Sequence, residues 1–409
     1  MRIADFFALA IAVSLPWSSS VLAIVLFLWL IAIIPTLGFD AVRREVMTAA
    51  GGFPVAFWII AVVGMFWADV SWSERLGGLD SLHKLLVIPL LMAHFRRSNR
   101  GGRVVNGFLI SCAMLAVVSW ALALLPGLPW RGKEIGVPVK DYISQAILFV
   151  ICICILADRL WDCLERKQVR QVFGLAAIIL LFGANIVYVV TARTALVVLP
   201  VLLLLLGFRR LAWKGGAIIL LLGSIFLAIG WGSSPYLRMR VVGVYEEIKR
   251  TELENADTSS GQRLEFWRKS LRFIASAPLI GHGTGSITEQ FRDAVVGNVG
   301  PASVASANPH QQILATAIQL GFVGAIVLIA MWVAHLVLFN GAGPVAWIGT
   351  VFVVQNIVGS LFNSHLFDFT HGWIYVVGVG VVGGMIRHKP NELRHGQSML
   401  DRVEPHAAH

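Results

Sequence analysis

The amino-acid sequence predicts an all-α polytopic membrane protein. Hydrophobic residues make up 57% of the 409 residues, the mean hydropathy is +0.76, and only 14% of the residues are charged. This composition is far too apolar for a soluble domain of this length. Fourteen Trp and a formal net charge of +10 fit the same class, because aromatic belts and cytoplasmic Lys/Arg clusters are expected in membrane proteins. We therefore do not interpret the excess of basic residues as a sign of nucleic-acid binding.

Apolar segments recur along nearly the whole chain. About 20 apolar residues cross a bilayer as a helix, and shorter spans are tolerated. On this basis we expect about twelve transmembrane helices, near residues 4–18, 20–37, 52–69, 81–95, 104–126, 142–158, 171–190, 195–208, 214–232, 309–338, 344–362 and 371–386.

The basic residues at the ends of these segments are distributed unevenly between the two sides of the membrane. One side receives most of the Lys and Arg of the short loops, including Arg43, Arg96, Arg166, Arg209 and Arg387. Cytoplasmic loops are enriched in Lys and Arg, so we expect both termini to be cytoplasmic.

One connection is much longer than a simple loop needs. It divides the chain into transmembrane helices (1–232), a helical loop on the non-cytoplasmic face (233–308), further transmembrane helices (309–386) and a cytoplasmic basic tail (387–409). Within the loop, "GQRLEFWRKSLRFIASAP" has apolar residues at helical spacing, and a second helix is expected from Ser286 with Glu289 as its capping-box partner. We expect a small helical cap over the outer mouth of the membrane bundle. The apolar positions of the first helix are Leu264, Trp267, Leu271 and Ile274.

Two arginines on the outer face are candidate functional residues. Arg193, in "VVTARTALVV", lies in a short connection between two strongly apolar segments, and Arg263 opens the amphipathic helix of the loop. Charges at membrane depth are costly and usually face a cavity or a partner. The alternatives are that Arg193 snorkels to lipid phosphates and that Arg263 belongs to a solvated helix face.

A histidine stands behind an Asn-Pro pair in "ANPHQQILATAIQLGFVG". Asn308 suits an N-cap, Pro309 suits the first helical position, and Gln311 lies three residues after Asn308, as a capping box requires. A helix N-terminus disfavours imidazolium, so His310 is expected to be neutral near pH 7 and available as a general base. The alternative is an ordinary interfacial histidine.

Further positive charge is expected on the same face, from Lys84 and from the cluster Arg131, Lys133 and Lys140. Converging arginines suit a pyrophosphate, which accepts bidentate charge-assisted hydrogen bonds. Such a site needs no metal, and we expect no cofactor.

Other histidines lie in outer loops. His282 falls in the glycine-rich turn "APLIGHGTGSI", and His365, Asp368 and His371 crowd "FNSHLFDFTHG". No cysteine supports a metal site there, so we expect a loop that at most lines the site. The chain also has no nucleotide-binding glycine fingerprint, which argues against a cytosolic nucleotide-sugar donor.

The succession of "TARTALV", "GQRLEFWRKSLRFIASAPLIGHGTGS" and "NPHQQILATAIQLGFVG" resembles the O-antigen ligase and polymerase superfamily of bacterial envelopes, and most closely the ligases. The resemblance covers roughly residues 185–325. It implies a GT-C-like glycosyltransferase of the inner membrane that moves a polysaccharide from undecaprenyl pyrophosphate to a sugar of lipid A-core in the periplasm.

The resemblance also implies roles for individual residues. The family histidine falls on His310 as general base, and the family arginines fall on Arg193 and Arg263. Around them we expect substrate-binding residues at Lys84, Arg131, Lys133, Lys140, Gln311 and His282.

Three alternatives remain open at this stage. An O-antigen polymerase, or a related lipid-linked oligosaccharide transferase, uses a similar donor. A transporter of the lipid-linked glycan predicts ionisable residues near the bilayer midplane and repeat symmetry, and the sequence has neither feature.

Overall fold

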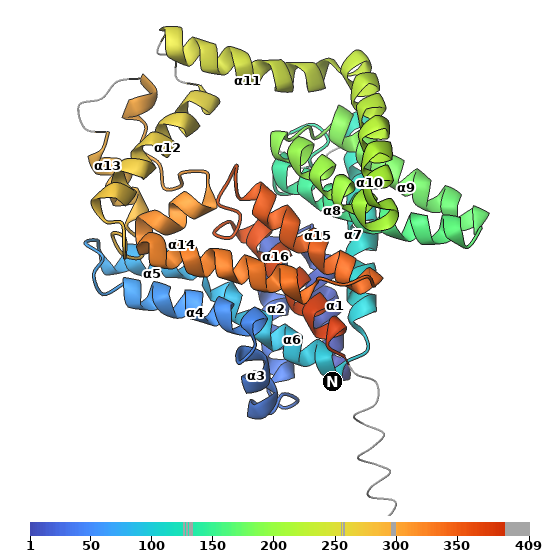
Figure 1. The fold of residues 1–409 in the computed structure, drawn as a ribbon, viewed down its shortest axis with the longest axis horizontal. Coiled ribbons are helices and arrows are strands. Elements are labelled where there is room, and N and C mark those ends of the chain that lie inside the picture. The colour runs from blue at the N-terminus through green and yellow to red at the C-terminus, as the bar shows by residue number, and fades with distance from the viewer. Residues whose placement is uncertain are drawn as a thin grey trace, which may run out of the picture.

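The protein is described by a computed structural model that covers residues 1–125, 127, 130, 134–254, 256, 258–295 and 300–388. In these residues the regular structure is helical, apart from one isolated bridge between Glu134 and Val137. The helices (Figure 1) are α1 (Arg2–Ser14), α2 (Ser19–Ile33), α3 (Phe39–Val46), α4 (Ala49–Gly64), α5 (Trp72–Asp80), η1 (His83–Leu86), α6 (Val87–Arg97), α7 (Gly101–Leu124), α8 (Tyr142–Glu165), α9 (Val169–Tyr188), α10 (Arg193–Ser233), α11 (Pro235–Glu254), α12 (Ser259–Ser276), α13 (Ile287–Asp293), η2 (Gly300–Ser303), α14 (Gln312–Leu338), α15 (Pro344–Gly359) and α16 (Phe369–Ile386).

The apolar helices pack into one bundle. The most extensive helix pairs are α6 with α16, α8 with α9, and α4 with α14. α8 and α16 are the most enclosed candidate spans, and their apolar side chains join a continuous core that includes Phe149, Trp347 and Tyr375. This confirms the predicted all-helical membrane class.

Fewer of the described helices than the twelve predicted are long and apolar enough to be candidate membrane spans. Six described helices are long and apolar enough to cross a membrane, and the candidates rise to nine if each of three bent helix pairs is one span. α2 and α15 are apolar but shorter than a bilayer requires. The segments predicted at 195–208 and 214–232 lie on either side of a break in α10, where the backbone of Leu211 and Ala212 is not helical. Twelve spans therefore stay a prediction.

Basic residues predicted to share one side of the membrane form two groups of ion pairs. Glu45 at the end of α3 pairs with Arg96 of α6 and with Arg387 after α16. At the kink of α10, Arg210 pairs with both Asp158 and Asp162 of α8. These buried and half-buried ion pairs join helix ends that are distant in the sequence. The remainder of the predicted basic tail, residues 389–409, lies outside the described residues.

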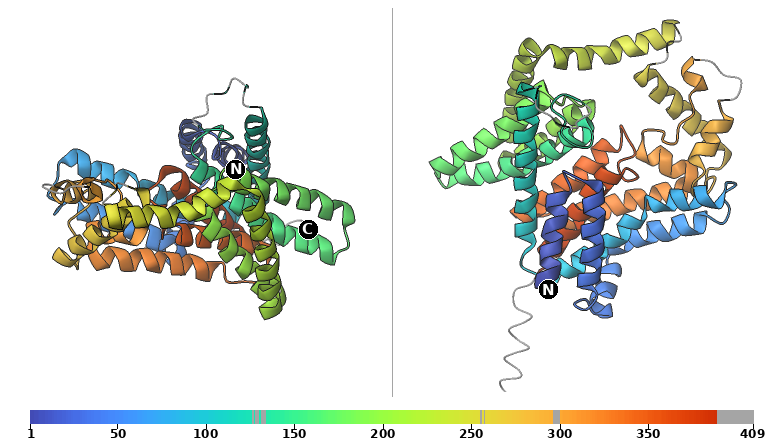
Figure 2. Two further views of the ribbon diagram at one scale, coloured as in Figure 1. Left: turned by 90° about the horizontal axis from the view of Figure 1, so that it is seen from above. Right: turned by 180° about the vertical axis from the view of Figure 1, so that it is seen from behind.

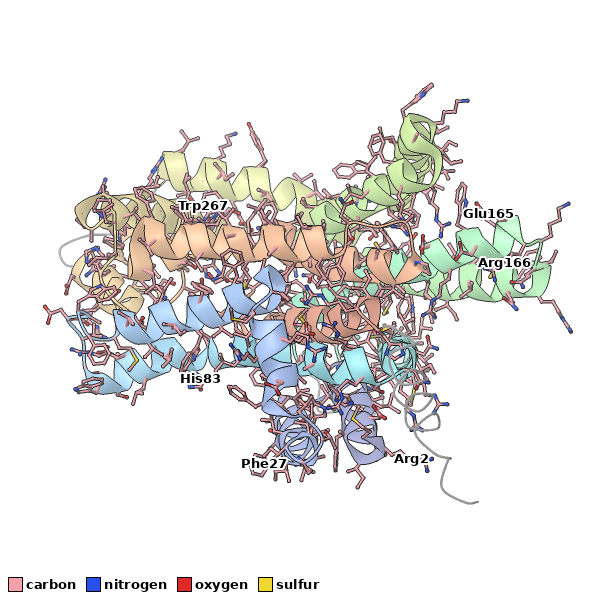
Figure 3. The ribbon with its side chains drawn as sticks, turned by 60° about the horizontal axis from the view of Figure 1, so that its bottom comes forward. Arg2, Phe27, His83, Glu165, Arg166 and Trp267 are labelled. Carbon is pink, nitrogen blue, oxygen red and sulfur yellow. The ribbon has the colours of Figure 1, made fainter. Side chains whose placement is uncertain are left out.

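The segment from 233 to 308 contains helices, as predicted. α11 lies at 98° to the end of α10 and runs along the edge of the molecule from α10 to α12 (Figures 1 and 2). α12 and α13 pack through Phe266, Ile274 and Phe291 against the first half of α14. In Figure 3, Trp267 of α12 and Arg166 after α8 lie at opposite ends of the molecule. α12 and the basic end of α8 therefore lie on different sides of the molecule in this view.

The predicted helix cap and the predicted buried face in this segment are partly wrong. α13 begins at Ile287 after Ser286, as expected, but Ser286 makes no capping hydrogen bond to the helix, and its hydroxyl donates instead to the Gly283 carbonyl. In α12, Ile274 is buried as predicted, whereas Leu271 is exposed. The buried face follows the tertiary contacts of Phe266 and not the helical wheel alone.

The start of α14 also differs from the prediction. The N-cap is Gln311, whose side chain accepts from the Leu314 amide, and the helix begins at Gln312. Asn308 is not the N-cap, because its side-chain oxygen accepts from the His310 amide and closes a local turn. His310 consequently lies before the helix and not in its first turn.

Candidate active site

A cavity of about 520 Å³ lies where α10, α11 and α12 meet. Three arginines line it, one from each helix: Arg193, Arg240 and Arg263. Its remaining lining is mainly apolar and includes Leu196, Val197, Val241, Val244, Ile248, Leu264, Trp267 and Phe362. The cavity therefore combines a cationic wall with an apolar wall.

Arg193 is the first residue of α10 and is held by contacts from two other helices. Its Nη2 and Nη1 donate to the two carboxylate oxygens of Glu247 on α11, at 2.8 and 3.3 Å. Nη1 also donates to the Ser260 hydroxyl at 3.2 Å, and Nε donates to the Arg240 carbonyl at 3.3 Å. These contacts, which reach α11 and α12, place the guanidinium at the cavity wall.

Glu247 is a site residue that the sequence analysis missed. Besides Arg193, its carboxylate accepts from the Ser260 amide and hydroxyl and from the Ser259 hydroxyl, at the beginning of α12. Burial raises the pKa of Glu247, but the hydrogen bonds from Arg193 and Ser260 and the Arg193 charge outweigh burial and lower the pKa to about 2. Glu247 is thus ionised at neutral pH and joins three helices.

Arg240 is the second residue that was missed. Its guanidinium lies 4.7 Å from the ring centroid of Tyr142 and 5.3 Å from that of Tyr236, and Nη2 donates to the Tyr236 hydroxyl. Cation–π contacts of this kind fix an arginine in place. A signal was present, because Tyr236, Arg240 and Glu247 share one face of a helix at i, i+4 and i+11.

Arg263 lies on α12 and lines the same cavity. Burial lowers its pKa, and the charge of Arg193 lowers the pKa further. In the part of the chain that the structure describes, Arg263 forms no ion pair or hydrogen bond. It is therefore a cation available to an anionic ligand.

His310 lies beside this arginine cluster. Its ring stacks on Phe266 of α12, with ring centroids 6.1 Å apart, and its Nδ1 lies 3.1 Å from Asn363 Oδ1. Asn363 follows Phe362, which lines the cavity. The backbone of His310 has φ +55°, a left-handed conformation that is uncommon for residues other than Gly and recurs at functional sites.

The imidazole of His310 is neutral for a different reason than the helix dipole that the sequence suggested. Burial lowers its pKa, the positive charge of Arg263 lowers the pKa further, and the hydrogen bond with Asn363 acts in the opposite direction. The net pKa is below 6.5, so the imidazole is neutral at pH 7.

The structure does not bring the predicted outer lysines into the cavity lining. Lys84 is 6% exposed and donates to the Asp368 carbonyl at 2.7 Å. Lys140 donates to the Leu15 carbonyl at 2.6 Å, and burial lowers its pKa to about 8. Arg131 and Lys133, which complete the predicted cluster, lie outside the described residues.

Gln311 and His282 occupy structural positions. Gln311 caps α14 next to His310. His282 Nε2 donates to the Phe273 carbonyl at 2.9 Å, and the His282 amide donates to the Ile318 carbonyl in α14. His282 therefore joins the glycine-rich turn to α12 and α14.

The loop between α15 and α16 contains the cluster of histidines. The rings of His365 and His371 stack with centroids 4.1 Å apart, and His371 Nδ1 lies 2.8 Å from Asp368 Oδ1. No group of three or more metal-ligating residues was found among the described residues. The loop contacts the 308–312 segment through Asn363 and Ser364.

Fold and site together define a helical integral membrane protein with a cationic, apolar-walled cavity beside a neutral histidine. Residues 175–329 match the family model described as O-antigen ligase. This match covers less than half of the chain, and the matched segment, which is similar to that family, contains Arg193, Arg240, Glu247, Arg263 and His310. A search of curated proteins found no match.

Proposed function

We propose that this protein is an O-antigen ligase, which transfers a polysaccharide from undecaprenyl pyrophosphate to a sugar of lipid A-core. The observation that carries the proposal is the convergence of Arg193, Arg240 and Arg263 on one cavity next to His310. The family match at 175–329 supports the class of reaction.

The two kinds of cavity wall suit the two parts of such a donor. Arginine guanidinium groups bind phosphate oxygens through paired, charge-assisted hydrogen bonds, and the apolar side chains suit the first isoprene units. Arg263 has all its donors available. Four of the five N–H donors of Arg193 are used by Glu247, Ser260 and the Arg240 carbonyl, which leaves one on Nη2 for the donor.

The proposed reaction is a single displacement at the anomeric carbon. His310 accepts the proton of the acceptor hydroxyl, and the hydroxyl oxygen attacks the anomeric carbon of the first sugar. The bond from that carbon to the phosphate oxygen breaks, and undecaprenyl pyrophosphate leaves with the bonding electron pair. Arg193 and Arg263 stabilise the charge that develops on the leaving group. The configuration at the anomeric carbon is inverted, and neither a metal nor a nucleotide is required.

The distribution of basic residues supports an orientation for this site. By the positive-inside rule, the helix ends that carry Arg96, Arg210 and Arg387 face the cytoplasm. In the proposal the loop helices α11 to α13 face the periplasm, in the inner membrane of a bacterium. A GT-C-like architecture and the twelve spans belong to the same proposal.

Reconstitution in proteoliposomes tests the proposal against its nearest alternatives. The purified protein is given lipid-linked glycan, with or without lipid A-core. Glycan attached to the core supports the ligase. Longer lipid-linked glycan without an acceptor would identify a polymerase, and movement of the glycan across the bilayer without new bonds would identify a transporter.

A further inference from the structure

The hydrogen bonds around His310 determine which nitrogen of its ring carries the proton. The backbone amide of His310 lies 2.8 Å from the side chain of Asn308. A backbone N–H only donates, so the Asn308 atom that faces it is the carbonyl oxygen. The Ser364 hydroxyl, 2.7 Å from the same oxygen, is compatible with this assignment.

The Asn308 side chain fixes the orientation of Asn363. With its oxygen assigned, the other end of the Asn308 side chain is the amide nitrogen, which only donates. This nitrogen lies 3.2 Å from Asn363, so the facing atom of Asn363 is its carbonyl oxygen Oδ1.

Asn363 in turn contacts the imidazole ring of His310. The same Asn363 oxygen lies 3.1 Å from His310 Nδ1. An amide oxygen only accepts, so Nδ1 must carry a hydrogen. In a neutral ring the lone pair is then on Nε2, and the hydrogen bonds of the described residues leave Nε2 without a partner.

We propose that Asn363 is a positioning residue that holds His310 in its Nδ1–H tautomer and thereby makes Nε2 the general base. This inference rests on the proposed function, because it assigns the atom that accepts the proton of the acceptor hydroxyl. The hydrogen bond made by one ring nitrogen sets the role of the other. In serine proteases, an orienting residue that imposes the wrong tautomer lowers kcat by about 10⁴.

A neutral orienting residue suits this location. The charged group that acts on His310 is Arg263 of α12, while Phe266 of α12 and Asn308 and Asn363 of the adjoining loops are uncharged. A carboxylate in place of Asn363 would also accept from Nδ1, but it would stabilise the imidazolium. Asn363 fixes the tautomer without that electrostatic effect.

Two substitutions of Asn363 separate these effects. Asn363→Leu removes the acceptor, and we expect kcat to fall by about a hundredfold, since general base catalysis contributes about 10²–10⁴, with KM nearly unchanged. Asn363→Asp keeps an acceptor for both Asn308 and His310. We expect it to retain most activity at high pH and to move the acid limb of the kcat/KM profile to higher pH. Ser364→Ala is the matched control, because it removes a bond to Asn308 from the same loop and leaves the acceptor of Nδ1 intact.

The tautomer is read directly by ¹⁵N NMR of histidine-labelled protein in lipid bilayers, with the His310→Asn spectrum subtracted. The expected spectrum shows a protonated Nδ1 and an unprotonated Nε2 for His310, and a change of that pattern in Asn363→Leu. An Nε2–H tautomer in the parent protein would overturn the inference whatever the activity. Equal rates for the parent and Asn363→Leu would overturn it as well. If His310→Asn were itself active, the proposed general base would fail, although the tautomer assignment would stand.

Discussion

Arg193 and Glu247 form a two-point ion pair across the cavity wall, with Nη2 to Oε1 at 2.8 Å and Nη1 to Oε2 at 3.3 Å. Paired hydrogen bonds of this type fix the plane of the guanidinium, which a single contact cannot do. Glu247 also binds Ser260 at the beginning of α12. The arginine that opens α10 is thus oriented by α11 and α12, and its direction depends on the fold of the long loop.

Replacing Arg193 with Lys should lower the transfer rate by a hundredfold or more. Lysine keeps the charge but loses the planar donors that bind both oxygens of Glu247 and hold the remaining Nη2 hydrogen toward the donor, and losing that contact raises the barrier by about 2–4 kcal/mol. The measurement is the initial rate in proteoliposomes at matched protein levels and saturating acceptor. A rate within about twofold of the parent would show that Arg193 does not bind the donor through its planar guanidinium.

Glu247→Gln is the companion variant, because it leaves Arg193 in place and weakens the contacts that orient it. We expect a loss of about tenfold, smaller than that of Arg193→Lys, because the glutamine keeps one acceptor oxygen of the same reach. If the two variants lost the same activity and the same thermal stability, Arg193 would serve only to tie the helices together.

His310→Asn should abolish transfer and leave the protein folded. Asparagine tolerates the left-handed backbone that His310 adopts at φ +55°, but its amide cannot accept a proton as a base. The cap of α14 rests on Gln311 and is unaffected. The checks are glycan transfer and thermal unfolding in detergent, with His310→Ala as a second variant. Near-normal transfer by either variant would remove His310 from the mechanism.

The sequence predicts the helices better than it predicts the site. Every predicted apolar segment overlaps an observed helix, and the predicted Arg193 and Arg263 both line one cavity. These features could be predicted because hydropathy and charge placement are local signals. Arg240 and Glu247 were missed. In the sequence each resembles an ordinary surface charge, and only the tertiary structure places it beside α10 and α12.

The start of α14 shows why local signals can mislead. Asn308, Pro309 and Gln311 match a capping box, yet α14 begins at Gln312. The Asn308 side chain is used by the His310 amide and by Ser364, and the Gln312 amide donates to the Ser360 carbonyl. Partners about fifty residues along the chain decide this boundary, and the local pattern does not contain them.

The acid limb of the pH profile should lie below pH 6.5 and respond to Arg263. The base is the neutral imidazole, so kcat/KM falls as the pH drops through the lowered pKa of His310. Arg263→Gln removes a charge that disfavours imidazolium, so the pKa of His310 rises and the limb moves to higher pH, together with a loss of rate. Burial still lowers this pKa, so the limb should not reach the pH expected for a solvated histidine. A limb that stayed in place or moved to lower pH would contradict the assignment of His310 as base.

Chelation should change the rate by less than about twofold. Three arginines supply the positive charge at the cavity, and such a site can stabilise a pyrophosphate leaving group by itself. The test compares purified protein with and without EDTA. Loss of activity that a divalent cation restores would refute the arginine site as proposed.

Gly321→Ala should destabilise the protein by disrupting the broken helix α14. At Gly321 the backbone has φ +59° and ψ −158°, a region that is essentially restricted to glycine and costs other residues about 1–3 kcal/mol. The amides of Phe322 and Val323 donate to the Pro278 and Leu279 carbonyls, and the Ile318 and Gln319 carbonyls that they would otherwise use accept from residues 282 and 283. An alanine Cβ would lie 2.3 Å from the Leu279 carbonyl oxygen, which would displace this turn from α14.

The measurements for Gly321→Ala are thermal unfolding in detergent and hydrogen exchange over residues 278–285, with Gly223→Ala as control. A Cβ at Gly223, inside α10, meets nothing within 4 Å, and alanine favours a helix interior by up to about 1 kcal/mol. We expect Gly321→Ala to lower the melting temperature and speed exchange in the turn, while Gly223→Ala does neither. Because the first half of α14 follows directly on His310, the transfer rate should fall together with protection of the turn. Unchanged exchange and unchanged stability in Gly321→Ala would show that the turn does not depend on the break in α14.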